Sequence, residues 1–274
     1  VYNQIIMTPK QAPRMVQNAI QHAISKKGAA VIGLPGDISE LPAEDNITST
    51  QIFKTNPIIR PNDYELNELA SLINSNQKIT VFCGIGAENA HQEIVALSQK
   101  LHAPVGYSFR GKMSTQHDNP NEVGMTGLLG LPSAYHSMFE SDLLILLGTD
   151  FPYTDFIPTD KKIVQIDLNP ERLGRRAQVD LGLCGDIKNT IDALLPLITQ
   201  KVDNSFLESQ LKIYEKVKEN LLTYVKNTGD TKNIQPEYLA HSICHIASDD
   251  AIFTLDTGMT NVWGARFIKS TGKR

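Results

Sequence analysis

The sequence predicts an α/β fold built on a doubly wound parallel sheet. Short and almost wholly apolar segments recur at residues 79–83, 143–147 and 163–166. Such segments are typical of strands that are buried on both faces of a sheet. The stretches between them have the spacing of amphipathic helices, and alternating strands and helices indicate a parallel sheet that is covered on both sides.

Composition and charge limit the classes of function. The 274 residues are 41% hydrophobic and 20% charged, which is enough chain for about two globular domains. The 26 basic and 30 acidic side chains leave a net charge of -4 without a basic block, so no nucleic-acid partner is expected. The longest apolar stretch, residues 143–147, is far shorter than the about 20 residues that cross a bilayer, and a cytoplasmic location is expected. Three widely spaced cysteines without a C-x-x-C motif favour reduced thiols.

The first 42 residues predict one helix and one strand. Thr8 and Gln11 have the spacing of a capping box, with Pro9 at the first helical position, so a helix is expected over residues 9–26. A strand at residues 29–32 follows. Residues 43–56 are polar and have no sustained period, which predicts an interdomain linker.

The predicted sheet domain covers residues 57–198. Its expected helices span residues 63–74, 89–101 and 187–198, and its expected strands lie at residues 79–83, near Val105, and at 143–147, 163–166 and 179–183.

The remaining residues predict a connector and the start of another domain. Ser205 and Glu208 suggest a second capping box, and the helix over residues 206–226 is rich in Lys and Glu, which predicts an exposed connector within residues 199–230. Residues 231–274 predict a helix to about residue 247, a strand at 251–255 and a helix that begins near Asn261. Because the chain starts at Val1 and ends in an amphipathic run, we expect a piece of a longer protein.

Residues that suit a nucleotide follow several predicted strands. They lie at residues 84–87, 148–153, 167–170 and 185–186, where the carboxyl ends of parallel strands meet at one edge of the sheet. Glycines permit close backbone approach, while carboxylates and amides accept hydrogen bonds from ribose hydroxyls. The pattern therefore predicts a nucleotide that lies across this edge.

The glycine pattern does not favour a standard NAD site. Asn89 stands where the dinucleotide fingerprint has its third glycine, and no acidic residue lies about 20 residues further on. Arg110 and Lys112 follow the strand near Val105, where cations would neutralise a diphosphate. A solvated basic loop is the alternative interpretation.

Histidines give no sign of a metal site. His241 and His245 lie four residues apart on a predicted helix, which is a spacing that suits a metal, but no third ligand residue has a spacing that would place it beside them. No metal site is therefore expected.

Several strings together resemble the central domain of the thiamine-diphosphate-dependent pyruvate oxidases, with the quinone-linked branch closest. They lie at residues 82–87, 110–112, 118–120, 123–127, 148–153, 165–170 and 185–187. The resemblance implies a Rossmann-like central FAD-binding domain at residues 57–198, between partial flanking α/β domains. Residues 1–42 would be the tail of a pyrimidine-binding domain, and residues 231–274 would start a diphosphate-binding domain.

The resemblance also implies which residues bind cofactors. For FAD these are Gly84, Gly86, Ala87, Arg110, Lys112, Thr149, Asp150, Phe151, Asp167, Asn169, Arg172, Gly185, Asp186 and Ile187. Thr257, Gly258, Met259 and Thr260 match a segment near the diphosphate of thiamine diphosphate. The catalytic Glu and the magnesium motif of the family are expected outside this chain, so no catalytic residue is expected within it and the chain alone is expected to be inactive.

The activity implied for the parent protein is oxidation of pyruvate to acetate and carbon dioxide, with FAD, thiamine diphosphate and Mg²⁺. Electrons would pass to a quinone, and the parent would be a homo-oligomer at the inner face of a bacterial membrane. Two alternatives remain open: an acetolactate-synthase-like carboligase in which FAD does not turn over, and a central scaffold domain without a cofactor.

Overall fold

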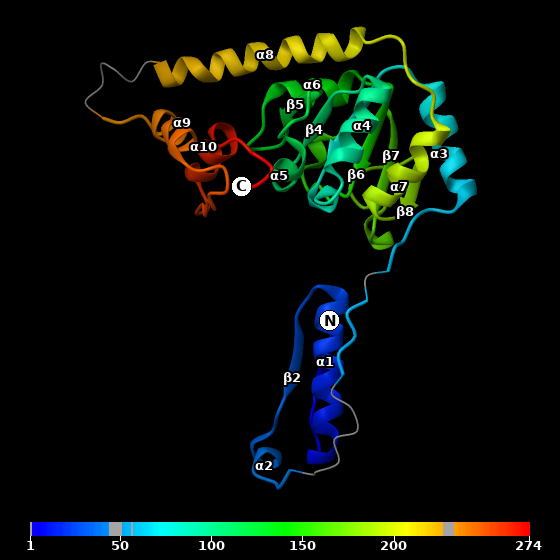
Figure 1. The fold of residues 1–274 in the computed structure, drawn as a ribbon, viewed down its shortest axis with the longest axis vertical. Helices are drawn as coiled ribbons and strands as arrows, with labels where there is room; N and C mark the ends of the chain where they lie inside the picture. The colour runs from blue at the N-terminus through cyan, green and yellow to red at the C-terminus, as the bar shows by residue number, and fades with distance from the viewer. Residues whose placement is uncertain (1, 44–50, 56, 227–232) are drawn as a thin grey trace. The chain divides into compact units, whose positions relative to one another are not determined.

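A computed structural model describes residues 2–43, 51–55, 57–226 and 233–274. The chain divides into two compact units, Val1–Ile58 and Ile59–Arg274, and each is described by itself (Figure 1). Residues 44–50 and 56 of the predicted linker lie outside the described residues. So do residues 227–230 of the predicted connector and residues 231–232 of the predicted third domain.

In its described residues, the first unit contains two parallel strands, the helix that connects them and a short helix that follows. Strands β1 (Tyr2–Ile5) and β2 (Ala30–Gly33) pair in parallel, and α1 (Ala12–Lys26) connects them; α2 (Gly36–Ser39) follows. Thr8 is the N-cap residue of a 3-10 turn, Pro9–Gln11, that leads into α1, as predicted, but the predicted capping box is wrong because the Thr8 side chain makes no capping hydrogen bond. Strand β1 is additional to the expected elements, since its sequence lacks an apolar run.

The second unit contains a six-stranded parallel sheet, which confirms the predicted fold class (Figure 1). The strand order is β5-β4-β3-β6-β7-β8, and every neighbouring pair is parallel. The chain starts in the middle of the sheet, builds one half outward and then returns to build the other, which is a doubly wound topology. The strands are β3 (Ile79–Cys83), β4 (Val105–Tyr107), β5 (Glu122–Met125), β6 (Leu143–Leu147), β7 (Lys162–Asp167) and β8 (Leu181–Cys184).

Helices cover both faces of this sheet and continue beyond it. None of the described helices combines the length and the apolar character that a bilayer span requires. The helices of the unit are α3 (Asp63–Ser75), α4 (His91–Leu101), α5 (Lys112–Thr115), α6 (Pro132–Glu140), α7 (Ile187–Leu194), α8 (Ser205–Lys226), α9 (Pro236–Ile246) and α10 (Met259–Phe267).

Alternate residues of the central strands enter two separate cores. Val81 and Ile145 belong to the core beneath α3, α4 and α7, whereas Phe82 and Leu146 belong to the core beneath α6. All four side chains are at most 3% exposed. Burial on both faces explains why these strands are apolar throughout rather than alternating with polar residues.

The predicted capping box of α8 is wrong by one residue. Ser205 is the first helical residue, and Asn204 precedes it as the cap: Glu208 N donates to the Asn204 carbonyl at 2.9 Å, and Asn204 Nδ2 donates to Glu208 Oε1 at 2.8 Å. A complete capping box occurs at α3 instead, where Asn62 and Glu65 exchange hydrogen bonds of 2.9 and 3.0 Å.

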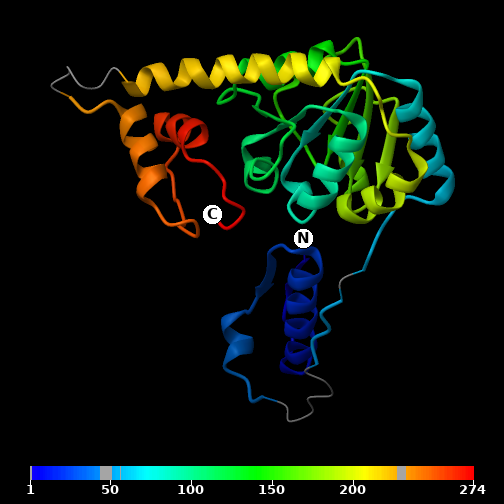
Figure 2. The same ribbon diagram turned by 45° about the horizontal axis from the view of Figure 1, so that its top comes forward.

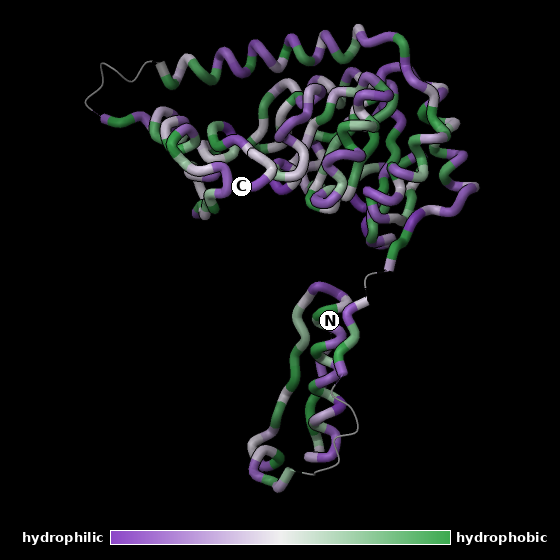
Figure 3. Tube along the Cα trace, in the orientation of Figure 1, coloured by the Kyte–Doolittle hydropathy of each residue, from purple (hydrophilic) through white to green (hydrophobic). Residues whose placement is uncertain are grey.

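Helix α8 was predicted from its composition to be an exposed connector, but one face of it packs against the second unit. Leu207, Gln210 and Tyr214 lie on one stripe of the helix and are buried. This stripe packs against α6 and β5, so α8 lies alongside α6 (Figure 2). Hydrophilic and hydrophobic residues alternate along the helix (Figure 3), as expected for a helix with one packed face.

The strand predicted at residues 251–255 does not form among the described residues. A strand needs a hydrogen-bonded neighbour, and no described strand pairs with this segment. Ile252 is accordingly 92% exposed. Helix α10 begins at Met259, two residues before the predicted start, and lies beside α9.

A partly buried carboxylate fastens α8 to the sheet. Glu122 Oε1 accepts hydrogen bonds from the hydroxyls of Tyr107 at 2.5 Å and Tyr214 at 2.8 Å. Burial raises the pKa of Glu122 above its usual value, although the tyrosine hydrogen bonds act in the opposite direction. The carboxyl group therefore joins β4, β5 and α8 at one point.

The raised pKa of Glu122 predicts a pH-dependent stability. The folded state holds this proton more tightly than the unfolded chain, so the free energy of unfolding falls as the pH rises above the usual carboxyl pKa of 4.5. Glu122→Gln keeps the shape without the titration and is expected to remove this fall. Urea unfolding of both proteins between pH 4 and pH 8 measures the effect; parallel stability curves would contradict it.

Candidate functional site

The candidate site lies where the chain direction reverses in the middle of the sheet. Strands β3 and β6 are neighbours there, and the loops that follow them lead to opposite halves of the sheet. Such a switch point at the carboxyl ends of parallel strands is where doubly wound folds bind ligands.

Glycines allow the loops after β3 and β6 to touch. A Cβ atom on Gly84 would lie 2.5 Å from the Gly148 carbonyl oxygen, and one on Gly86 would lie 2.7 Å from Gly148 Cα. Gly148 also has φ +56°, which favours glycine. Gly84 and Gly86 are thus required for contact between two loops, whereas the sequence predicted that they bring the backbone close to a cofactor. Ala87, which follows them, lies fully buried in the core.

The residue before this contact is an inert thiol. Cys83 ends β3 and is fully buried. Burial raises the pKa of its thiol to about 12. Among the described residues no group of three or more His, Cys, Asp or Glu side chains is placed to hold a metal ion.

A cavity of about 490 Å³ opens beside this contact. The loops that follow β3, β4, β5, β6 and β7 all line it, and they contribute Ile85, Arg110, Leu129, Phe151 and Arg176 among others. Of the predicted FAD residues, Arg110, Thr149, Asp150, Phe151 and Arg172 line the cavity. Five predicted residues from three loops that are distant in sequence therefore meet in one place.

Arginines dominate the charge of the cavity. Asp150 accepts hydrogen bonds from Arg176 Nε at 2.9 Å and from Arg175, so its negative charge is matched by two cations. Burial pushes the pKa of Asp150 up, but the hydrogen bonds from the arginines outweigh it and hold the pKa below its usual value. Arg110 and Arg172 add two further positive charges to the lining, so the cavity favours an anion.

Asp167 has one carboxylate oxygen without a partner among the described residues. This side chain ends β7 and is 2% exposed; Oδ1 accepts from Asn169 N at 2.9 Å, while Oδ2 is buried and has no hydrogen bond. Arg172 Nη1 lies 3.9 Å from Oδ1. A buried acceptor without a donor is costly, and a ligand hydroxyl group would satisfy it.

Lys112 occupies a different place from the one predicted. Its side chain is 5% exposed, and its ammonium group donates to the carbonyl oxygens of Ala265, at 2.6 Å, and Ile268. Burial lowers the pKa of Lys112 to about 8. The predicted role at a diphosphate is therefore wrong in this structure, because the amine holds the end of α10 instead.

Three predicted adenosine contacts have structural roles here. Asp186 caps α7 by accepting from Asn189 N at 3.0 Å, and Ile187 is buried in the core. A Cβ atom on Gly185 would lie 2.6 Å from Pro61. These residues join the start of the unit to the end of β8 and do not line the cavity.

The predicted thiamine diphosphate segment forms the exposed N-terminus of α10. Gly258 is the N-cap residue with φ +128°, and Met259 starts the helix. Thr257 N donates to Asp256 Oδ1 at 2.7 Å, and Thr260 Oγ1 donates to the Asp256 carbonyl at 2.8 Å. The four predicted residues are thus contiguous and ordered around Asp256.

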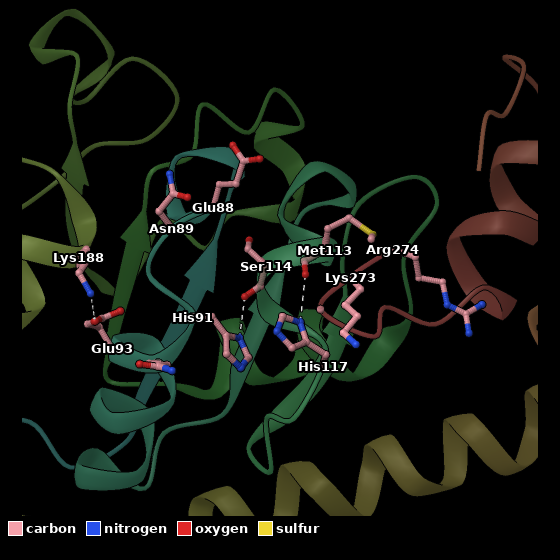
Figure 4. A pocket seen from close by; sticks show the side chains of 12 residues that line it. Glu88, Asn89, His91, Glu93, Met113, Ser114, His117, Lys188, Lys273 and Arg274 are labelled. Carbon is pink, nitrogen blue, oxygen red and sulfur yellow. Dashed lines mark hydrogen bonds and ion pairs between the residues drawn. The ribbon is translucent and has the colours of Figure 1, made fainter. Parts of the chain in front are cut away.

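Another cavity, of about 510 Å³, contains two stacked histidines (Figure 4). The rings of His91 and His117 lie 3.8 Å apart, and each Nδ1 faces a backbone carbonyl oxygen, of Ser114 and Met113 respectively. Burial and the neighbouring His91 lower the pKa of His117. None of the predicted site residues lines this cavity.

Comparison with known proteins agrees with the fold of the second unit. Residues 66–194 match the family described as thiamine pyrophosphate enzyme, central domain. This segment therefore resembles a thiamine pyrophosphate enzyme central domain. The loops that line the cavity all belong to this central domain.

Curated relatives extend beyond the central domain. An uncharacterized 42.6 kDa protein of Pseudomonas amyloderamosa is 41% identical over 80% of this chain and 56% of its own length. A putative thiamine pyrophosphate-containing protein of Bacillus subtilis is 30% identical over 98% of this chain and 46% of its own length. The pyruvate oxidase of Lactiplantibacillus plantarum is 24% identical over 98% of this chain and 45% of its own length. Acetolactate synthases also match. The chain therefore spans about half the length of these relatives.

Sequence reasoning missed part of the cavity wall of the central domain. Arg176 lines the cavity and, together with the neighbouring Arg175, neutralises Asp150; the two arginines lie nine and eight residues after the end of β7. Two adjacent arginines shortly after a strand end could have indicated positive charge at this edge of the sheet. Leu128 and Leu129 also line the cavity, but they follow β5, which has no apolar run that would have predicted it.

The contact between these loops predicts that adding one methyl group at Gly86 lowers the stability of the fold. Gly86→Ala places a Cβ atom 2.7 Å from Gly148 Cα, so we expect a loss of roughly 1–3 kcal/mol of folding free energy. Gly182→Ala is the matched control, because its Cβ atom would meet Leu173 at an ordinary 3.5 Å. Urea denaturation of both variants measures the difference; equal stability would contradict the packing described here.

Proposed function

We propose that this chain supplies the FAD site of a larger thiamine-diphosphate-dependent enzyme. The observation that carries the proposal is the switch-point cavity, in which Arg175 and Arg176 already neutralise Asp150 and Arg110 and Arg172 add further positive charge to the lining. A diphosphate is a dianion that suits such a set of guanidinium groups, because each presents several fixed donors.

The other parts of FAD find suitable partners around the same cavity. Phe151 and Tyr153 meet edge to face at 5.4 Å and offer apolar surface for a flat ring system. Asp167 is not itself part of the cavity lining, but it lies next to the lining residue Arg172, and its buried, unpartnered Oδ2 is an acceptor that suits a ribose hydroxyl. A cavity of about 490 Å³ is within the usual range for cofactor pockets.

The reaction proposed for the parent enzyme is oxidative decarboxylation of pyruvate. Pyruvate and water give acetate and carbon dioxide, and the two electrons and two protons released pass to a quinone. FAD supplies the two-electron acceptor that this reaction requires. The residues described above bind and orient that cofactor, while the catalytic groups and the magnesium site are proposed to lie in other parts of the parent protein.

The domain plan and the location of the parent are further proposals. Residues 1–42 are assigned to the tail of a pyrimidine-binding domain and residues 231–274 to the start of a diphosphate-binding domain, with Thr257–Thr260 beside thiamine diphosphate. A cytoplasmic homo-oligomer that reaches its quinone at the inner membrane face fits this plan.

An acetolactate-synthase-like carboligase is the second candidate, since acetolactate synthases are among the relatives. In that case the cavity would hold an FAD that does not change redox state. Anaerobic addition of pyruvate to the parent enzyme separates the two, because only the oxidase reaction bleaches the flavin absorbance. A scaffold with an empty cavity would bind no flavin at all.

FAD is expected to stabilise this chain. At about 100 times its dissociation constant, a ligand adds about 2.7 kcal/mol, which corresponds to a rise in Tm of roughly 5 to 11 °C. Thermal melts with and without FAD, beside the visible spectrum of the desalted protein, measure this. Riboflavin, which lacks the diphosphate, is the control and should give a smaller shift; no shift with FAD and no retained colour would contradict a self-sufficient site.

Arg110 is expected to contribute to FAD affinity through charge. Arg110→Gln removes one cation from the cavity lining and should raise the Kd for FAD about tenfold, the usual effect of losing a charged hydrogen bond. Arg14→Gln, an exposed position in the first unit, is the matched control. Fluorescence titration with FAD measures both; equal affinities would remove Arg110 from the site.

A further inference from the structure

Helix α10 is anchored to the central domain at two separate places. At the first, Lys112 holds the carbonyl oxygens of Ala265 and Ile268, and Ser270 Oγ donates to the Met113 carbonyl at 3.0 Å. Both of these contacts reach α5, which does not line the switch-point cavity.

The second anchor reaches the wall of the switch-point cavity itself. Arg266 Nε donates to the Leu129 carbonyl, and Arg266 Nη2 donates to the Gly130 carbonyl, each at 3.2 Å. Leu129 lines the cavity, together with Thr126 and Leu128 from the same loop. One planar guanidinium group therefore fixes two consecutive carbonyl groups of a cavity-lining loop.

This loop is a tight turn that also faces Phe151. Gly130 N donates to the Gly127 carbonyl at 2.9 Å, and Leu131 N donates to the Met125 carbonyl at 2.7 Å. Gly127 has φ +102°, and a Cβ atom there would lie 2.9 Å from the Phe151 ring. The loop conformation and the position of this ring are therefore linked by direct contact.

We propose that Arg266 is a positioning residue that couples the FAD cavity to the start of α10. It holds the loop of residues 126–131, and through that loop the Phe151 side of the cavity, against the helix that begins with Met259 and Thr260. This inference rests on the proposed function, because it assigns FAD to the cavity and thiamine diphosphate to the start of α10.

The coupling works in both directions. A group that orders the start of α10 also favours the loop conformation that receives FAD, and FAD favours the ordered helix to the same extent in free energy. The two cofactors would then bind cooperatively.

The test compares Arg266→Met with Ser270→Ala in the full chain. Arg266→Met keeps an unbranched apolar side chain and removes both donors to the loop, whereas Ser270→Ala loosens the same helix only at α5. Hydrogen exchange of the amides of Gly130 and Leu131 reports on the loop without any ligand. FAD titration then reports on the cavity, and Arg266→Lys, which retains one donor group, tests rescue.

In Arg266→Met we expect faster exchange at both amides and an FAD Kd that is raised roughly 3- to 30-fold. We expect Arg266→Lys to reverse part of both effects, and Ser270→Ala to change both measurements little. Unchanged exchange overturns the positioning role, and so does an equal effect of Ser270→Ala. Faster exchange with unchanged FAD affinity overturns the link to the cavity. If the unmodified chain itself binds no FAD, the proposed function fails for this chain and the coupling fails with it, whatever the exchange shows.

Discussion

The close approach of the loops after β3 and β6 is the constraint on which the candidate site depends. Both strands lie at the centre of the sheet, so their ends are surrounded by other loops and cannot spread apart. Glycine at positions 84, 86 and 148 permits the backbones to touch, and this contact sets where each loop departs. The cavity opens beside this contact, and five strand ends contribute to its walls.

The distribution of charge around the cavity differs from that of a standard dinucleotide site. There the glycine-rich loop and the helix that follows it receive the diphosphate. Here the glycine loop is engaged with Gly148, and the cations come from the loops after β4 and β7, as Arg110, Arg172 and Arg176. The positive charge thus lies on side chains rather than on backbone amides, so the absence of a third glycine does not exclude a nucleotide.

The sequence predicted those parts of the structure that depend on local pattern. Apolar runs located β3, β6 and β7, and strand ends located Arg110, Asp150 and Phe151 at one edge. Strand β5 and helix α6 escaped prediction, because β5 contains Gly124 with φ +90° and α6 is a short helix with several small polar residues. The sequence also could not predict the direction of a long side chain. Lys112 lies two residues from Arg110, yet its amine faces α10, which is more than 140 residues further along the chain.

Cys83 gives the site a chemical property that packing alone does not suggest. Burial raises the pKa of this thiol to about 12, so it stays protonated at neutral pH, whereas the thiolate is the form that reacts with peroxides and alkylating agents. The residue directly before the glycine contact is therefore resistant to oxidation.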